Sequence, residues 1–256
     1  MLQIKIAVQL ASLKLPLKKG LLTAREMGAE AVEIDARHEP ALAELSQTGV
    51  RQVRKMLDDL NLRVSCLGYR TRRGYHVADD LEPRIEATKR ALKLAYDLGT
   101  NVVVNHIGRV PAEATSTLVQ ALTDIGSYSH KVGAFLAAET ATESGADLAR
   151  LLARLPPGAI GVDLNPAQLI LHGHSPAEAV RALAPHVLHV HASDGTRDLA
   201  LGRGIEVQLG RGSAELPELL AVLEEHQYRG YITVERRDAD SPIGDVRQAV
   251  EFLRNL

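Results

Sequence analysis

Carboxylate, amide and imidazole side chains recur where short apolar segments of this sequence end. The residues concerned are Glu139, Asn165, His191 and Glu235, and the segments are 134–138, 160–164, 187–191 and 231–235. Carboxylate oxygens and imidazole nitrogens around one centre suit a divalent ion such as Mn²⁺, Zn²⁺, Co²⁺ or Mg²⁺. The pattern predicts a metal site wherever the fold brings these four segment ends together.

Each residue alone also has an ordinary structural explanation. A glutamate after a strand is typical of a helix N-cap or a loop salt bridge, and the pair His189 and His191 equally fits hydrogen-bonded histidines at a barrel rim. Cys66 lies inside an apolar segment and indicates a small core residue rather than a nucleophile. No Gly-x-Ser-x-Gly motif is present, so Ser/His/Asp hydrolysis has no support.

Eight short apolar segments alternate with longer helical patterns from end to end. The apolar segments are 4–10, 31–34, 63–67, 101–107, 134–138, 160–164, 187–191 and 231–235. Their starts are about 32 residues apart, which is the spacing of a (β/α)₈ barrel of about 250 residues. A doubly wound sheet uses the same alternation, but the first segment is not followed by Gly-x-Gly-x-x-Gly. The sequence therefore predicts one TIM barrel domain over residues 1–256, with its site at the carboxyl ends of the strands.

The helical patterns fill the intervals between the apolar segments. They cover 16–27, 48–61, 82–98, 113–132, 145–155, 176–184, 216–225 and 243–253. The widest interval separates His191 from Tyr231 and holds a Gly/Arg-rich stretch from Gly202 to Gly212. We interpret this stretch as a long loop over the barrel mouth.

Composition excludes several classes of protein. The formal charge is 30 − 32 = −2, whereas a broad nucleic-acid surface needs a clear Lys/Arg excess. A single cysteine excludes an internal disulfide framework and a Cys-rich zinc module. No apolar segment reaches about 20 residues, and the amino terminus lacks a signal-peptide pattern, so we expect a cytoplasmic protein without a membrane anchor.

Several motifs resemble the xylose-isomerase-like TIM barrels, which include sugar isomerases and epimerases, inosose dehydratase and endonuclease IV. They are Gly-Ala-Glu-Ala-Val-Glu-Ile-Asp at 28–35, Ala-Glu-Thr at 138–140, His-Val-His at 189–191, Leu-Gly-Arg-Gly at 209–212 and Tyr-Arg-Gly-Tyr-Ile-Thr-Val-Glu at 228–235. The resemblance covers essentially the whole chain. It implies metal ligands from strands five to eight, with Glu139, His191 and Glu235 at three of the positions. It also implies that Glu139 and Glu235 form the acid/base pair and that Arg197 binds substrate.

Strand six departs from the family pattern. Relatives carry Asp-Pro-Ala-Asn-Leu or Asp-Thr-Gly-His-Leu there, whereas this chain reads Asn165-Pro166-Ala167-Gln168-Leu169. Asn165 thus stands at the position of a ligand aspartate, and an amide oxygen holds a cation more weakly than a carboxylate. Asp163 points the same way two residues earlier and is an alternative ligand. A metal-free site is the other reading.

The resemblance and the strand-end residues together predict a metal-assisted isomerase or epimerase of a small sugar, sugar phosphate or polyol. We expect His106, Gln168 and Arg197 to contact the substrate, and Arg72 to help form a cationic rim for an anionic group. A dehydratase or lyase would use the same groups, and a degenerate barrel would bind a sugar without turnover. The near-neutral charge and the few ligands disfavour the endonuclease IV role. A homodimer is plausible for such a barrel.

Overall fold

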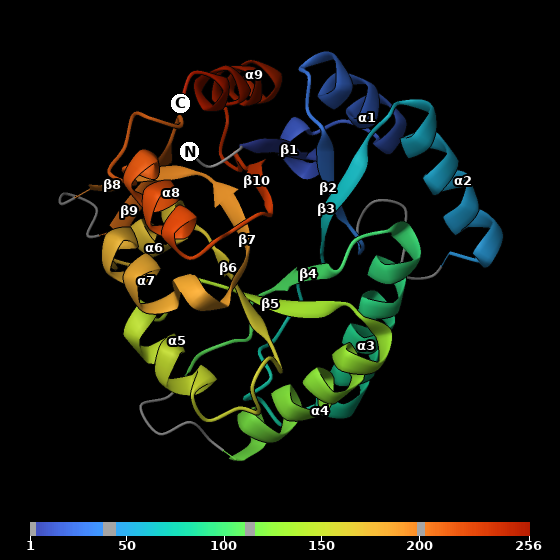
Figure 1. The fold of residues 1–256 in the computed structure, drawn as a ribbon, viewed down its shortest axis with the longest axis vertical. Helices are drawn as coiled ribbons and strands as arrows, with labels where there is room; N and C mark the ends of the chain where they lie inside the picture. The colour runs from blue at the N-terminus through green and yellow to red at the C-terminus, as the bar shows by residue number, and fades with distance from the viewer. Residues whose placement is uncertain (1–3, 38–44, 111–115, 199–202) are drawn as a thin grey trace.

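Eight parallel strands close into a barrel in the described parts of the chain (Figure 1). The computed structural model describes residues 4–37, 45–110, 116–198 and 203–256. In spatial order the strands are β1 (Lys5–Gln9), β10 (Tyr231–Val234), β7 (Val187–Ala192), β6 (Gly161–Leu164), β5 (Phe135–Glu139), β4 (Val102–Asn105), β3 (Arg63–Gly68) and β2 (Ala31–Asp35). Each predicted strand segment overlaps one of them, and the predicted barrel is confirmed.

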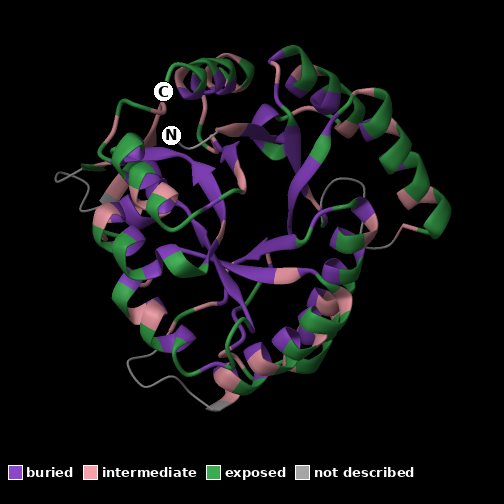
Figure 2. Cartoon of the chain, in the orientation of Figure 1, coloured by how far each residue is buried: buried purple, intermediate pink, exposed green. Residues whose placement is uncertain are grey.

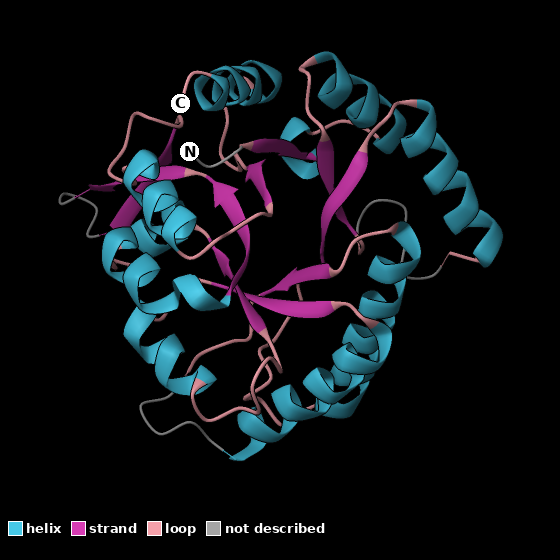
Figure 3. Ribbon diagram, viewed as in Figure 1, coloured by secondary structure: helices cyan, strands magenta, loops and turns pink. Residues whose placement is uncertain are grey.

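Helices alternate with the barrel strands and surround them (Figure 3). They are α1 (Leu17–Glu26), α2 (Gln47–Asp59), α3 (Leu81–Leu98), α4 (Ser116–Val132), α5 (Gly145–Leu152), α6 (Pro166–Leu171), α7 (Pro176–Leu183), α8 (Leu216–Glu225) and α9 (Pro242–Arg254), with the short 3-10 helices η1 (Leu10–Leu13) and η3 (Ala184–His186). Serine side chains cap the amino ends of α2, α5 and α7, because each accepts a backbone N–H from the first turn. None of the described helices combines the length and the apolar character needed to cross a membrane.

Side-chain alternation along the strands separates the main core from the barrel interior. Residues such as Val8 and Val190 belong to the large apolar cluster that also takes in the helices, and the strands are buried almost throughout (Figure 2). A second cluster holds Cys66, Val102, Val104 and Ala137. Cys66 on β3 lies 3.3 Å from His189 on β7, and these strands are not neighbours, so the contact crosses the barrel interior. The barrel interior therefore combines this apolar cluster with a polar group, His189.

The helix α6 and two strands, all between β6 and α8, differ from the prediction. The helical periodicity does not predict α6, which has only six residues and begins where Asn165 accepts the backbone N–H of Gln168. The predicted loop over the mouth is wrong for residues 203–207, because β8 (Asp194–Asp198) and β9 (Arg203–Val207) form an antiparallel hairpin, whereas residues 208–212 form a loop with turns. The hairpin packs on α6 so closely that a Cβ at Gly204 would lie 2.6 Å from the Cα of Leu171. Gly202 lies outside the described residues.

One buried carboxylate holds the two ends of the hairpin segment. Asp194 accepts backbone N–H groups from Gly195, Gly210, Gly212 and Ala214, at 2.8 to 3.0 Å. Four such donors satisfy a carboxylate that is only 3% exposed. The chain leaves β7 and returns towards α8 at nearly the same point.

Candidate functional site

The carboxyl ends of four barrel strands bring the predicted ligand residues together. They are Glu139 at the end of β5, Asn165 after β6, His191 on β7 and Glu235 after β10, and all four are buried. Glu139, His191 and Glu235 have ligand atoms within 4.8 Å of one another, which is close enough to hold a metal ion. Among the described residues, the same criterion is met by Glu33, Cys66 and His189, and by Asp163, His189 and His191.

Two arginines bridge the carboxylates of Glu139 and Glu235. Arg237 places its Nε 2.7 Å from Oε1 of Glu235 and its Nη2 2.6 Å from Oε1 of Glu139. Arg70 places its Nη2 2.7 Å from the same Glu139 oxygen and 3.4 Å from the same Glu235 oxygen. Charge-assisted hydrogen bonds of this kind offset the cost of burying two carboxylates, whose side chains are 4% and 1% exposed.

Asn165 donates to the same two carboxylates. Its Nδ2 lies 3.0 Å from Oε1 of Glu139 and 2.6 Å from Oε2 of Glu235. Its Oδ1 accepts the hydroxyl of Ser193 at 2.7 Å and the backbone N–H of Gln168 at 3.3 Å. A backbone N–H can only donate, so these contacts fix which end of the amide faces the carboxylates.

His191 lies between two carboxylates on the other side of the site. Its Nδ1 is 2.9 Å from Asp163 and its Nε2 is 2.7 Å from Glu33. Burial alone would lower the pKa of His191, but Asp163, Glu235 and Glu33 raise it well above its usual value. Burial would raise the pKa of Glu33, yet the charge and hydrogen bond of His191 lower it to about 2. The imidazolium is therefore held by an ionised carboxylate at each ring nitrogen.

His189 continues this network into the barrel interior. Its Nδ1 is 2.8 Å from Asp163 and its Nε2 is 2.7 Å from the hydroxyl of Thr233. Asp163 thus orients both histidines, and their charges and hydrogen bonds hold its pKa below its usual range although burial opposes this. Burial raises the pKa of the Cys66 thiol, and Glu33 and Asp163 raise it further. The thiol therefore stays protonated, as the prediction of a core cysteine requires.

Four site residues are not among the predicted set, and three of them come from the opposite wall of the barrel. Those three are Gln9 on β1, Glu33 on β2 and Arg70 after β3, and the fourth is Arg237, two residues after Glu235. Gln9 links the two halves of the site, because its Nε2 donates to Glu33 at 3.0 Å and to Glu235 at 2.9 Å. In the sequence, Glu33 could have been identified as a site residue because it is ionisable and lies inside the apolar segment Ala31–Asp35.

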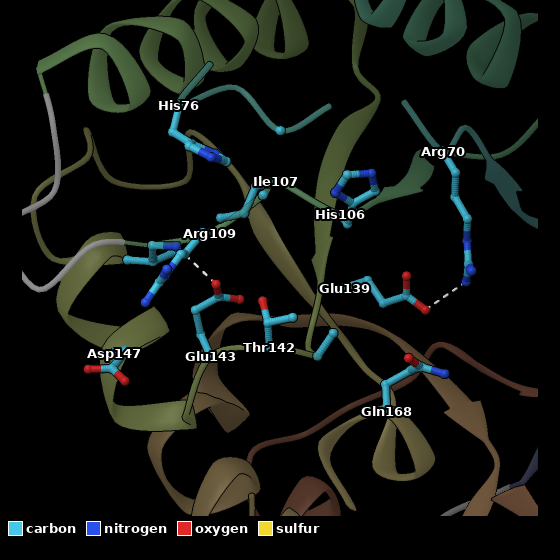
Figure 4. A pocket seen from close by; sticks show the side chains of 14 residues that line it. Arg70, His76, His106, Ile107, Arg109, Glu139, Thr142, Glu143, Asp147 and Gln168 are labelled. Carbon is cyan, nitrogen blue, oxygen red and sulfur yellow. Dashed lines mark hydrogen bonds and ion pairs between the residues drawn. The ribbon is translucent and has the colours of Figure 1, made fainter. Parts of the chain in front are cut away.

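A pocket of about 790 Å³ opens next to Glu139 (Figure 4). Arg70, His106 and Gln168 line it with Glu139, and the lining continues through His76, Arg109, Thr142, Glu143 and Asp147. His106 and Gln168 therefore lie where the sequence predicts substrate contacts. Glu235 does not line the pocket and lies behind the guanidinium groups of Arg70 and Arg237.

The other two predicted substrate residues lie elsewhere. Arg197 is exposed on β8 and donates to the carbonyl oxygen of Gly173, because the hairpin packs on α6 and directs it there. Arg72 is exposed and does not line the pocket. The arginines that do line it are Arg70 and Arg109.

The far wall of the pocket depends on two glycines that cross without side chains. A Cβ on Gly74 would lie 2.2 Å from the Cα of Gly108, and Gly108 has a φ of +88°. Nearby, Asn105 accepts the backbone N–H of Thr71 at 3.0 Å and donates to the Tyr75 hydroxyl at 2.8 Å. The loops after β3 and β4 are thereby held together beneath His76 and His106.

Comparisons with known proteins agree with this architecture. The family model of the xylose isomerase-like TIM barrel matches residues 21–256. A xylose isomerase domain protein from Planctomyces limnophilus has a TM-score of 0.85 at 23% identity, covering 98% of this chain and 96% of its own. A xylose isomerase-like TIM barrel protein from Mycobacterium smegmatis, solved with magnesium, has a TM-score of 0.78 at 18% identity, covering 100% of this chain and 96% of its own.

An epimerase is also among the similar structures. D-allulose 3-epimerase from Methylomonas sp., solved with D-allulose, has a TM-score of 0.74 at 18% identity, covering 100% of this chain and 98% of its own. No protein of curated function matches the sequence. At these identities the structural likeness shows the fold alone, whereas the family match extends over most of the chain. This chain belongs to the xylose isomerase-like TIM barrel family.

Proposed function

We propose that this chain is an isomerase or epimerase that moves a proton beside the carbonyl group of a small sugar, sugar phosphate or related polyol. Glu139 and Glu235 are the acid/base pair. The observation that carries the proposal is a buried glutamate, Glu139, facing a polar pocket, with a second carboxylate bound to the same guanidinium groups. Membership of the family, with sugar epimerases among proteins of the same fold, supports this chemistry.

The protonation of Glu139 suits proton transfer near neutral pH. Burial raises the pKa of Glu139 to about 8, although Arg70 opposes the rise, and Glu235 adds to it. General acid/base catalysis is most effective when the catalytic pKa lies near the working pH. Every hydrogen bond that described residues donate to this side chain goes to Oε1. We infer that Oε2 carries the exchanging proton and meets the substrate.

The two glutamates differ in what they can do. An aldose–ketose isomerisation needs one base that moves a proton between adjacent carbons, and Glu139 alone meets that need. An epimerisation needs an acid on the opposite face, which we assign to Glu235. Glu235 accepts hydrogen bonds on both oxygens, so a substrate reaches it only after its own hydroxyls replace the guanidinium contacts.

The pocket lining favours a polar substrate. Arg70 and Arg109 supply positive charge, Glu143 and Asp147 supply negative charge, and His106 and Gln168 supply further hydrogen-bonding groups. A guanidinium matches the geometry of a phosphate or carboxylate. These features support a substrate with several hydroxyl groups, and Arg109 is the group that would take a phosphate or carboxylate.

The family resemblance implies a divalent cation, held by the four predicted ligands. Distances alone allow Glu139, His191 and Glu235 to bind one. However, Asn165 turns its amide N–H groups to the carboxylates, and both ring nitrogens of His191 are already paired. As these side chains lie, the four predicted ligands do not fit a divalent cation, so no step here depends on one. The competing arrangement is a Mn²⁺, Zn²⁺, Co²⁺ or Mg²⁺ ion that displaces both guanidiniums.

Proton exchange gives a direct test that does not require the product to be known. Ketoses and aldoses, with and without a phosphate or carboxylate, are incubated with the protein in deuterated water and followed by proton NMR. We expect deuterium to enter beside the carbonyl of at least one substrate. Glu139→Gln should lower exchange about 100-fold or more, whereas Glu143→Gln, at another pocket carboxylate, should retain most of it.

The variants also separate the alternatives. Glu235→Gln should abolish epimer formation while leaving aldose–ketose isomerisation measurable. Loss of water from the substrate would identify a dehydratase, and saturable binding without exchange would identify a non-catalytic sugar-binding barrel. Exchange that survives in both glutamine variants would eliminate Glu139 and Glu235 as the acid/base pair.

A further inference from the structure

The buried carboxylates of Glu139 and Glu235 need positive charge close by, and arginine supplies it. A carboxylate removed from water is stable only when it is protonated, paired or bound to a cation. Arg237 spans the two carboxylates with one edge of its guanidinium, at 2.7 and 2.6 Å. Arg70 contacts the same two oxygens from the loop after β3, on the other side of the barrel. The region between the carboxylates thus already contains two full positive charges.

Asn165 fits a site without a metal. An aspartate there would add a third carboxylate beside Glu139 and Glu235, and a divalent cation or a bound proton would have to balance its charge. The amide instead donates to both carboxylates, at 3.0 and 2.6 Å. These three groups all disfavour a divalent cation. The two guanidiniums would repel it, and the neutral amide has no charge with which to bind it.

Both arginines have hydrogen-bond donors left for a substrate. Arg70 uses only Nη2 in the bonds that it donates to described residues, and Arg237 uses Nε and Nη2 of its side chain. A guanidinium carries five N–H groups. The two side chains are 36% and 30% exposed, so they enter the site from the mouth, where a substrate arrives.

We propose that Arg70 and Arg237 are catalytic residues that take the place of the divalent cation of this fold family, so that proton transfer at this site is metal-independent. The inference rests on the proposed isomerase or epimerase function. The guanidinium N–H groups hold the substrate's carbonyl oxygen in the position where a cation would otherwise polarise it. Such donors act by stabilising the negative charge that develops on that oxygen.

The step is balanced within the substrate and the chain's own groups. A glutamate carboxylate takes the proton from the carbon beside the carbonyl, and the C–H electron pair forms a carbon–carbon double bond. The carbonyl π electrons move to oxygen, and the resulting enolate accepts hydrogen bonds from Arg70 and Arg237. In an epimerisation, a glutamate returns a proton to the same carbon on the opposite face, and the carbonyl is restored. In an aldose–ketose isomerisation, the proton goes to the former carbonyl carbon, the neighbouring hydroxyl loses its proton and becomes the new carbonyl, and the former carbonyl oxygen takes up that proton. No oxidant, reductant or co-reactant is needed.

Manganese binding tests the inference without any substrate. Wild-type protein is titrated with Mn²⁺, and free Mn²⁺ is followed by electron paramagnetic resonance. We expect no stoichiometric binding in the micromolar range and no change in the thermal midpoint with millimolar Mn²⁺ or with a chelator. Tight binding of one Mn²⁺ per wild-type chain would overturn the inference, whatever the fate of the proposed function.

Arginine variants test whether Arg70 and Arg237 take the place of the cation. Arg237→Met and Arg70→Met each remove one charge beside the carboxylates, and we expect at least one of them to gain Mn²⁺ affinity. Arg72→Met, an exposed arginine outside the pocket, should behave as wild type. If neither variant gains affinity, the arginines do not stand in for a cation. Arg237→Lys is a milder variant that keeps the charge and loses the bridging edge, in case the methionine variants do not fold.

Turnover supplies the final measurement once a substrate is found. Wild-type exchange should be unchanged by a chelator, and Arg237→Met should lower kcat about 100-fold, with Arg237→Lys between the two. Exchange that requires added metal would leave the proposed function standing and refute this inference. Absence of exchange with every substrate would refute the proposed function, while the Mn²⁺ titrations still decide the inference.

Discussion

Replacing Asn165 with aspartate should destabilise the protein in a pH-dependent way. The substitution keeps the shape of the side chain and changes only the group that faces Glu139 and Glu235. The oxygen that accepts from Ser193 and from the Gln168 backbone is retained, so the amino end of α6 keeps its cap. Two donated hydrogen bonds, at 3.0 and 2.6 Å, become contacts between oxygens that both carry negative charge when ionised.

The size of the effect follows from these two contacts and from the protonation of Glu139. A hydrogen bond to a charged group contributes about 1.5–3 kcal/mol. The pKa of Glu139 is about 8, so at pH 7 this carboxyl group is mostly neutral, and its contact with the new aspartate is not a repulsion between two charges. The loss at pH 7 then comes chiefly from the Glu235 contact, at about 1.5–3 kcal/mol. At pH 9 both contacts are repulsive, and the loss grows to about 3–6 kcal/mol.

Urea unfolding followed by circular dichroism measures this difference. Wild type and Asn165→Asp are compared at pH 7 and pH 9 in the presence of a chelator. Asn101→Asp, the same chemical change at an exposed position before β4, is the matched control and should remain within about 0.5 kcal/mol of wild type. An Asn165→Asp protein as stable as wild type at pH 9 would show that the amide is not a donor to the two carboxylates, and the reasoning would fail.

Three further predictions concern the surroundings of the site. The pKa of Glu33 is about 2, below the usual 4.5, so its ion pair with His191 stabilises the fold above pH 4.5 and is lost as the pH falls towards 2. Chemical denaturation should show the free energy of unfolding drop by about 3 kcal/mol between pH 4.5 and pH 2. The drop should be smaller in Glu33→Gln. Gly74→Ala should cost about 1–3 kcal/mol in thermal unfolding because its Cβ meets the Gly108 backbone, whereas Gly20→Ala, inside α1 with 3.4 Å of clearance, should be neutral or stabilising. Asp194→Asn should lower the free energy of unfolding by about 3 kcal/mol, because it places an amide N–H₂ against backbone donors. A timed digestion should then show faster proteolysis of the 194–214 segment.

The barrel was predictable because its strands are buried on both faces. Such strands form near-continuous apolar segments, and all eight in the barrel stand out against the Ala-, Leu- and Glu-rich helices. Helix α6 is too short for a helical period to appear. The strands β8 and β9, Asp-Gly-Thr-Arg-Asp and Arg-Gly-Ile-Glu-Val, are mostly polar because the hairpin lies outside the barrel wall.

The site was predictable only where strand alternation decides it. Asp163 and Asn165 share one face of a strand, as do His189 and His191, so the residues after β5, β6, β7 and β10 had to converge. Loop arginines follow no such rule. Arg70 and Arg72 have the same parity after β3, yet only Arg70 reaches Glu139. The sequence also cannot tell which end of the Asn165 amide faces the carboxylates, because that depends on Ser193 and the start of α6.

The Asp194 carboxylate couples the hairpin segment to the barrel. Because one buried side chain holds Gly195, Gly210, Gly212 and Ala214, the end of β7 and the approach to α8 are fixed at one point. The interval between them also reaches the site, since Glu206 on β9 accepts the backbone N–H of Arg237 at 3.0 Å. A change in the hairpin therefore acts on the guanidinium that bridges Glu139 and Glu235, and a protein engineer who replaces the hairpin has to keep both contacts.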